Sequence, residues 1–267
     1  MTLPTASAST SLNEQVGYLC RYARILTGDQ AFALGCVASL FASPRHPALT
    51  AAPKTGMPVR LLYRLFANYY HQAQLFHREF DGNDPKQATA CRAPLSRQAM
   101  LLAGLERFPH EDTAYILDVD PSCIGELIVQ GEREIAAEPP ADVLILHDEP
   151  LVAMLWEDEI QNLGHRVAGT GRTRKEALAL VRERQPELIV ARARYLADGS
   201  RGVDVVEELL ALSGAGVIFL SGTPDQYLGE RQPARGVVVG LDACSPACGL
   251  AALMSQTLFF QRRGAAR

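Results

Sequence analysis

At 267 residues the chain is long enough for two domains of ordinary size, and its 48% hydrophobic and 21% charged residues exclude global disorder. A net charge of −4 argues against a protein built mainly to hold nucleic acid. The first residues lack the basic start and apolar core of a signal peptide, and no run of about eighteen apolar residues could span a membrane. These features predict a cytoplasmic protein.

The cysteines are spread along the chain without a CxxC pair. They are Cys20, Cys36, Cys91, Cys123, Cys244 and Cys248. Cys244 and Cys248 could in principle clip a metal ion, but no second pair of ligands follows at a suitable distance. Free thiols in a reducing compartment are the favoured interpretation.

The first part of the chain is predicted to be helical. Residues 1–12 are rich in Ser, Thr and Ala and have no periodicity, which is typical of a flexible tail. Over residues 13–80 apolar residues recur at steps of three and four, which predicts three amphipathic helices with a proline-rich connection at 44–58. Turn-forming residues mark a linker at 81–93.

Residues 94–137 form a second predicted helical region. Its first helix is broken before Pro109, a short helix spans 111–117, and a longer helix spans 121–136 after a tight turn. Short helix, turn and longer helix is the helix-turn-helix arrangement, whose last helix normally enters the major groove of DNA.

The charge of this region argues against DNA binding. Between Cys91 and Ile135 four basic residues stand against eight acidic ones: Arg92, Arg97, Arg107 and Arg133 against Glu106, Glu111, Asp112, Asp118, Asp120, Glu126, Glu132 and Glu134. Phosphate contacts supply most of the affinity for DNA, and an acidic surface repels them. We therefore interpret the region as a helix-turn-helix fold that binds protein.

Beyond a linker at 138–141, strand and helix patterns alternate over residues 142–261. Five strands are predicted, at 143–147, 165–170, 187–193, 216–221 and 237–241. A helical segment follows each strand, which favours a doubly wound, flavodoxin-like parallel sheet. Residues 262–267 are expected to be a tail.

The first of these strands leads into an acidic sequence, VLILHDEPL at 143–151. A buried strand that ends in polar residues opens at its carboxyl end, which is where ligands bind in open α/β sheets. Pro150 suits the first turn of the following helix. His147, Asp148 and Glu149 are therefore candidates for a site at that edge.

A series of motifs in the two halves resembles a known family. The motifs are PLSRQAMLLAGLE in the helical half, and VLILHDEPLVAM, LGHRVAG, TRKEALAL, LADGSRGVDVV, VIFLSGTP and TLFF in the α/β half. From residue 13 to residue 260 the chain is similar to the PhyR-type general stress response regulators. The resemblance implies an all-α sigma-factor-like N-terminal part, sigma-2-like at 13–80 and sigma-4-like at 94–137, followed by a response-regulator receiver domain at 142–261.

The resemblance also implies a function. In that family the sigma-like domain imitates a sigma factor and, when the receiver is phosphorylated, captures a small anti-sigma protein and so frees the real sigma factor. The implied role is therefore that of an anti-anti-sigma factor whose partner is a small, NepR-like anti-sigma protein. The acidic charge of the helix-turn-helix region points independently to a protein partner.

The resemblance implies that a receiver site combines an acidic pair, a phosphoacceptor Asp, a hydroxyl and a Lys at the ends of its strands. Here an imidazole, His147, precedes Asp148, and nitrogen ligands suit Mg²⁺ poorly. Ala193 stands at the expected acceptor position, Ser221 keeps the hydroxyl, and Asp242 takes the place of the lysine. The sequence thus predicts no phosphoacceptor, and only a poor metal site at Asp148 that we expect to hold no cofactor.

Two arginines, Arg192 and Arg194, flank the expected acceptor position. Either guanidinium could pair with Asp148 or Asp242 where Mg²⁺ and phosphate would otherwise lie. Asp148 could instead be solvated or cap the following helix, and Asp198, in the loop after the third strand, is a rival phosphoacceptor.

These observations favour a regulator over an enzyme, since no Gly-rich phosphate loop and no nucleophile–base set is identifiable. The alternative to an anti-anti-sigma factor is a DNA-binding sigma factor or transcriptional activator. A sensor kinase could still bind the receiver without productive phosphotransfer, and neither DNA nor a membrane is expected as a partner. The sequence leaves open whether the receiver is fixed open, fixed closed or set by another input.

Overall fold

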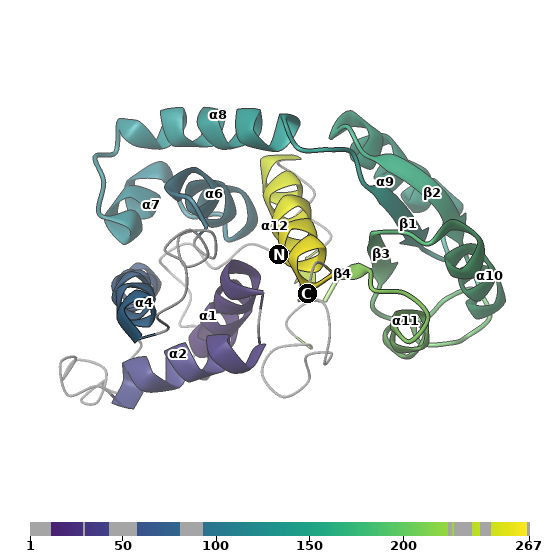
Figure 1. Ribbon diagram of the computed structural model, residues 1–267, viewed down its shortest axis with the longest axis horizontal. Coiled ribbons are helices and arrows are strands. Elements are labelled where there is room, and N and C mark those ends of the chain that lie inside the picture. Colours follow the sequence, from purple (N-terminus) through teal and green to yellow (C-terminus); the bar gives the residue numbers. More distant parts are fainter. Residues whose placement is uncertain are drawn as a thin grey trace. The chain divides into compact units, whose positions relative to one another are not determined.

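The computed structural model describes residues 12–28, 30–42, 58–80, 93–223, 226, 237–240 and 247–265 (Figure 1). The chain divides into two compact units, residues 1–131 and 132–267. Residues 1–11 of the predicted tail at 1–12, most of the predicted linker at 81–93 and the candidate Asp242 lie outside the described residues.

The described part of the first unit is built of helices. They are α1 (Leu12–Thr27), α2 (Gln30–Ala42), α4 (Val59–Phe80), α6 (Leu95–Met100), the π-helix η1 (Leu101–Leu105), α7 (His110–Leu117) and α8 (Cys123–Ala136), which continues into the second unit. The three predicted amphipathic helices of the 13–80 region are confirmed, as are the short and long helices of the helix-turn-helix.

Aromatic side chains form much of the core of this unit. The Tyr22 ring of α1 lies 5.3 Å from the Tyr63 ring of α4 and 6.2 Å from that of Phe66, centroid to centroid. Tyr63 also meets Phe108 edge to face at 4.9 Å. Because these rings are buried against each other, Tyr63 and Phe66 of α4 serve the packing of the core.

The helix after Pro94 differs from the expected single α-helix. Its second half is a π-helix, in which the Glu106 N–H donates to the Leu101 carbonyl oxygen at 2.9 Å, five residues back. Arg107 then adopts a left-handed conformation with φ 60°, and the Phe108 N–H closes the end on the Leu102 carbonyl oxygen. The extra residue in the last turn alters the direction in which Glu106 points.

Glu106 is the centre of a buried ionic cluster. Its side chain is fully buried, and Nη2 of Arg21 donates to both carboxylate oxygens at 3.0 Å. The hydroxyl of Tyr63 donates to the same carboxylate at 3.1 Å. Burial, with the Glu106 charge, raises the pKa of Tyr63 well above its usual value, so the phenol remains a donor. Three segments far apart in the sequence, from α1, α4 and the end of η1, therefore meet at one charge.

A second, exposed set of ion pairs joins α4 to α7. Arg60 contacts Asp112 at 2.8 Å, and Arg64 contacts Asp118 at 2.7 Å. Both guanidinium groups lie over the ring of Tyr115, at 5.4 and 4.3 Å from its centroid. The 13–80 region and the 94–137 region thus pack into one unit through charged as well as apolar contacts.

The second unit is a parallel five-stranded sheet with strand order β2-β1-β3-β4-β5. The strands are β1 (Asp142–Leu146), β2 (Arg166–Gly171), β3 (Leu188–Arg192), β4 (Gly216–Ser221) and β5 (Val237–Gly240). The helices are α9 (Pro150–Asn162), α10 (Arg174–Arg184), α11 (Gly202–Leu210) and α12 (Ala247–Ala265). This is the flavodoxin-like order, so the predicted fold class is confirmed.

Two layers of helices cover the sheet. Alternate residues of β1 and β3 face α10 and α11 and form one apolar cluster with them: Leu144, Leu146, Ile189, Ala191, Ala177, Val181, Val205 and Leu209 are among its members. The strand residues between them, such as Val143 and Val190, are also buried, on the side of α9 and α12. Burial on both faces explains why the strands are continuous apolar runs.

Local signals fix where the helices of this unit begin. Pro150 stands at the first position of α9, and the Thr173 hydroxyl caps α10 by accepting the Glu176 N–H at 3.3 Å. The Glu176 carboxylate reaches back to the residue before the cap and accepts the Arg172 N–H at 2.7 Å. Gly164, with φ 84°, ends the turn after α9.

The end of the chain differs from the expected tail, because α12 continues through Ala265. Arg262 of this helix contacts Glu187 at 2.9 Å and donates to the Pro139 carbonyl oxygen at 3.2 Å. The Ser255 hydroxyl lies 2.6 Å from both carboxylate oxygens of Glu138. The segment before β1 is therefore held on α12. None of the described helices has the length and apolar character to cross a membrane.

The cluster at Glu106 gives a stability prediction. E106Q removes the negative charge and leaves the Arg21 guanidinium buried without a carboxylate partner. We expect the free energy of unfolding to fall by about 3–5 kcal/mol, the usual effect of removing one partner of a buried ion pair. Urea unfolding followed by helical circular dichroism measures the change.

D112N is the matched control, because it removes the carboxylate that Arg60 contacts on the exposed surface of the same unit. Exposed ion pairs contribute little to stability, so its effect should be much smaller than that of E106Q. Equal losses in the two variants would contradict the structural importance of the buried cluster.

Candidate functional site

The candidate site lies where the strand order of the sheet reverses. β1 has β2 on one side and β3 on the other, and the crevice outside the carboxyl ends of such strands is the usual ligand site of this fold. Asp148 and Glu149 follow β1, and Arg192 is the last residue of β3. Residues 44 positions apart in the chain are thereby brought to one edge.

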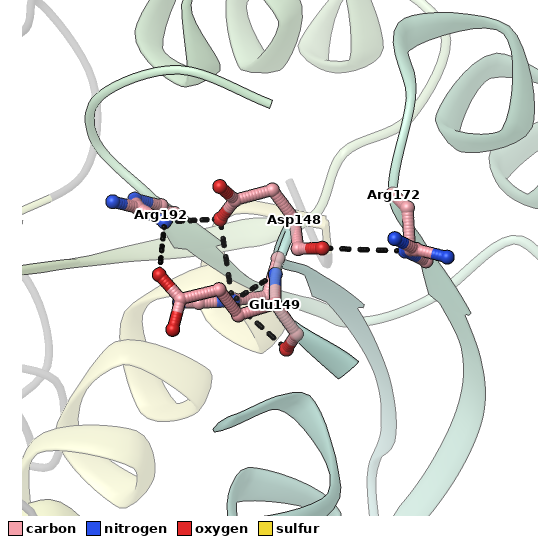
Figure 2. Close-up of polar contacts among 5 residues, drawn as sticks. Asp148, Glu149, Arg172 and Arg192 are labelled. Carbon is pink, nitrogen blue, oxygen red and sulfur yellow. Dashed lines mark hydrogen bonds and ion pairs between the residues drawn. The ribbon is translucent and has the colours of Figure 1, made fainter. Parts of the chain in front are cut away.

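At this edge the Arg192 guanidinium occupies the space beside the acidic pair (Figure 2). Its Nη1 donates to Oδ1 of Asp148, and lies 3.2 Å from Oε1 of Glu149. The side chains of Arg192 and Asp148 are only 28% and 26% exposed. Since side chains alternate along a strand, Arg192 points away from the face that Ala191 and Ala193 share, and so reaches the residues that follow β1.

A second arginine holds Asp148 from the other side (Figure 2). Nε of Arg172, from the turn after β2, donates to the main-chain carbonyl oxygen of Asp148 at 3.3 Å. The Asp148 backbone is therefore tied to the β2 edge while its carboxylate is tied to the end of β3.

His147 is buried and takes a structural part. Its Nδ1 accepts the Glu149 N–H at 3.0 Å, and its ring meets the Trp156 ring of α9 edge to face at 4.7 Å. Burial is the largest cause that lowers the pKa of His147 below its usual value, so the imidazole is neutral at pH 7 with its proton on Nε2. The 3.5 Å approach of Nδ1 to the Asp148 carboxylate is accordingly not an ion pair.

Ala193, at the expected acceptor position, has its methyl group in the apolar cluster under α10 and α11. Its N–H donates to the Leu220 carbonyl oxygen at 3.2 Å, which continues the pairing of β3 with β4 by one residue. Arg194, the next residue, is exposed. Of the two arginines that flank Ala193, it is Arg192 that pairs with Asp148.

The other candidates serve local structure. Ser221 ends β4, is buried, and accepts the Thr223 N–H with its hydroxyl oxygen at 3.1 Å. Asp198 caps α10 from a distant loop, because its carboxylate accepts the Arg174 N–H at 2.9 Å and the Ser200 N–H at 3.1 Å. Asp242 lies outside the described residues, so no contact is assigned to it.

The residues at this edge do not fit a magnesium ion. Mg²⁺ requires several oxygen ligands in near-octahedral geometry. The Asp148 carboxylate already accepts from a guanidinium, the available nitrogen of His147 accepts a backbone N–H, and Ala193 offers no ligand. Within the described ranges, no three His, Cys, Asp or Glu side chains gather as a metal-binding group.

Comparisons with known proteins identify the family to which this chain is related. The family model described as "Response regulator PhyR, sigma-like domain" matches residues 92–138. The phyllosphere-induced regulator PhyR of Methylorubrum extorquens is 36% identical over 253 residues, which cover 93% of this chain and 93% of that protein. The chain belongs to the PhyR family of response regulators.

Solved structures of PhyR proteins match both units. The response regulator PhyR from Brucella abortus is 32% identical, with 94% of each chain covered and a TM-score of 0.75. The anti-anti-sigma factor PhyR from Bartonella quintana is 29% identical, with 94% of this chain and 96% of that chain covered and a TM-score of 0.76. The latter protein has also been crystallised with the anti-sigma factor NepR.

Two residues that position the site were not identified from the sequence. Gly202 opens α11, and a Cβ at this position would lie 1.8 Å from the Arg192 carbonyl oxygen. Only a glycine permits this approach, which fixes the end of β3. Arg172 was also missed, because its bond to the Asp148 main chain depends on two loops that meet only in the folded sheet.

The close approach at Gly202 gives a prediction for the site. G202A drives a methyl group into the backbone at Arg192, so the end of β3 must shift and the contact with Asp148 is disturbed. We expect the free energy of unfolding to fall by at least about 1–3 kcal/mol, the usual effect of overpacking a core. Urea unfolding followed by the fluorescence of Trp156, the only tryptophan of the sequence, reports this change.

Gly214 supplies the control, because a Cβ there meets no atom within 4 Å. G214A should change stability by no more than about 0.5 kcal/mol, as is usual at unconstrained surface positions. If G202A proved as harmless as G214A, the close approach would not constrain Arg192.

Proposed function

We propose that this PhyR-family protein is a cytoplasmic anti-anti-sigma factor of the general stress response. Its helical unit imitates a sigma factor and sequesters a small, NepR-like anti-sigma protein. The observation that carries the proposal is the match to PhyR proteins over 93% of the chain, which spans both the helical and the α/β unit. The Bartonella quintana relative, an anti-anti-sigma factor, supplies the partner class.

We further propose that aspartyl phosphorylation does not control this protein and that it needs no cofactor. Three features support this: the methyl group of Ala193 at the acceptor position, the neutral imidazole of His147 in place of an acid, and the guanidinium of Arg192 on Asp148. A sensor kinase that docks on the α/β unit would accordingly find no carboxylate to phosphorylate at that position.

A regulatory role without catalysis fits the same residues. The relatives with which the chain aligns are regulators. At the carboxyl edge of the sheet, the Ser221 hydroxyl accepts a backbone N–H and the His147 Nδ1 does the same, so neither is arranged as a nucleophile with its base.

A second candidate, a DNA-binding sigma factor or activator, is favoured only by the helix-turn-helix of α7 and α8. The exposed residues of α8 oppose it, because Glu126 and Glu132 lie on the surface that would meet phosphate and Arg133 is the one basic residue of that helix. DNA binding would predict affinity that falls steeply with salt.

The test is a titration of the full chain with the small anti-sigma protein of its own cell, measured by calorimetry. We expect a complex with the same Kd in buffer alone and in buffer with Mg²⁺ and acetyl phosphate. A receiver domain with an intact acceptor Asp, treated in parallel, shows that the phosphoryl donor is active.

Absence of binding in both buffers would overturn the anti-anti-sigma role. Binding only after acetyl phosphate treatment, with a phosphoryl group found on the chain, would keep that role but overturn its independence of phosphorylation. Salt-sensitive binding to duplex DNA without binding to the anti-sigma protein would support the second candidate.

A further inference from the structure

We propose that Arg192 is a built-in replacement for the divalent cation of a receiver site, and that it holds the α/β unit in one state regardless of Mg²⁺. The inference concerns the regulation of the proposed anti-anti-sigma factor. Its biological role rests on that proposed function, but the ion pair itself does not. The contacts that carry it lie entirely within the second unit.

The first argument is charge. Asp148 and Glu149 are adjacent acids at the mouth of the sheet, and one Nη1 atom of Arg192 contacts both carboxylates. Two like charges at one edge repel each other unless a cation lies between them. The guanidinium therefore supplies a positive charge between these carboxylates where a metal ion would otherwise supply it, and it reduces the negative charge that would attract a metal ion.

The second argument is position. The main chain of Arg192 is fixed by the close approach of Gly202, and the next residue, Ala193, is anchored by its hydrogen bond to Leu220. Arg172 holds the main chain of Asp148 from the other side. Both partners of the ion pair are thus held in place by other groups, so less side-chain freedom is lost when the pair forms.

The third argument is permanence. An arginine side chain remains protonated in proteins, and its planar group suits carboxylates. A bound metal leaves when its concentration falls, whereas Arg192 is covalently part of the chain. A ligand shifts a conformational equilibrium only through a difference in affinity between the two states. Because the Arg192 guanidinium already occupies the cation position, we expect Mg²⁺ to bind neither state preferentially.

Arg194 provides the internal comparison. It lies two residues further on, beyond the end of β3, and is exposed. An arginine in this segment is therefore insufficient by itself, and the effect belongs to the last residue of β3, whose guanidinium contacts Asp148.

The experiment compares the full-length wild type with R192M and R194M. Methionine keeps much of the arginine stem and removes the guanidinium. Thermal unfolding is followed by the fluorescence of Trp156, which packs on His147 beside the site, while Mg²⁺ is varied over the millimolar range. Ca²⁺-free magnesium chloride is the probe, with sodium chloride at equal ionic strength as the reference.

We expect no saturable Mg²⁺ response in the wild type or in R194M. R192M should unfold at a lower temperature, since its carboxylates face each other without a cation, and added Mg²⁺ should raise its midpoint by a saturable amount. R192K is the conservative variant: its ammonium keeps a cation near the acids, so it should lie between the wild type and R192M and respond less to Mg²⁺.

Two results would overturn the proposal. One is a saturable Mg²⁺ response of the wild type as large as that of R192M, which would show that the metal competes with the guanidinium. The other is an R192M midpoint equal to that of the wild type at every Mg²⁺ concentration. If R192M fails to fold, R192Q, which also removes the positive charge, takes its place, and an R192Q midpoint equal to that of the wild type at every Mg²⁺ concentration would equally overturn the proposal. None of these readouts involves the anti-sigma protein, so failure here is distinct from failure of the proposed function.

Discussion

The contact between Arg192 and Asp148 is the constraint on which the α/β unit depends at its functional edge. Two carboxylates that follow β1 need a positive charge, and the chain supplies it from the end of β3. The surrounding groups support this contact. Gly202 allows the start of α11 to approach the Arg192 carbonyl oxygen, and Arg172 donates to the main chain of Asp148. The neutral imidazole of His147 accepts the Glu149 N–H in the same turn. The receiver scaffold carries an internal ion pair at this edge, and we propose that this pair takes the place of the metal ion.

The helical unit also contains an ion pair between distant segments, and there it is buried. The π-helix carries Glu106 to Arg21 and Tyr63, so one carboxylate joins helices from both predicted sigma-like regions. A buried ion pair is weak evidence for stability but often specifies one arrangement of the elements around it. The two predicted sigma-like regions are thereby joined within one compact unit.

Much of this was predictable from the sequence, and the exceptions have a common cause. Strand and helix order follows from apolar periodicity, and Ala193 and His147 are visible as departures from the motifs around them. What could not be predicted depends on non-local geometry. Arg192 and Arg194 are equivalent in sequence, and only the folded sheet separates them, because β3 ends at Arg192 and Arg194 lies beyond the strand. The partners of Glu106 likewise come from helices far away in the chain, with no local signal.

The most direct test of the central claim is a double-mutant cycle on the pair, with urea unfolding of the wild type, D148N, R192M and D148N/R192M. If the guanidinium and carboxylate stabilise each other, the two single losses will not add, and the coupling will be roughly 1 kcal/mol or more. Losses that add to within about 0.3 kcal/mol would show that the two groups act independently, and would contradict the replacement of the metal by Arg192.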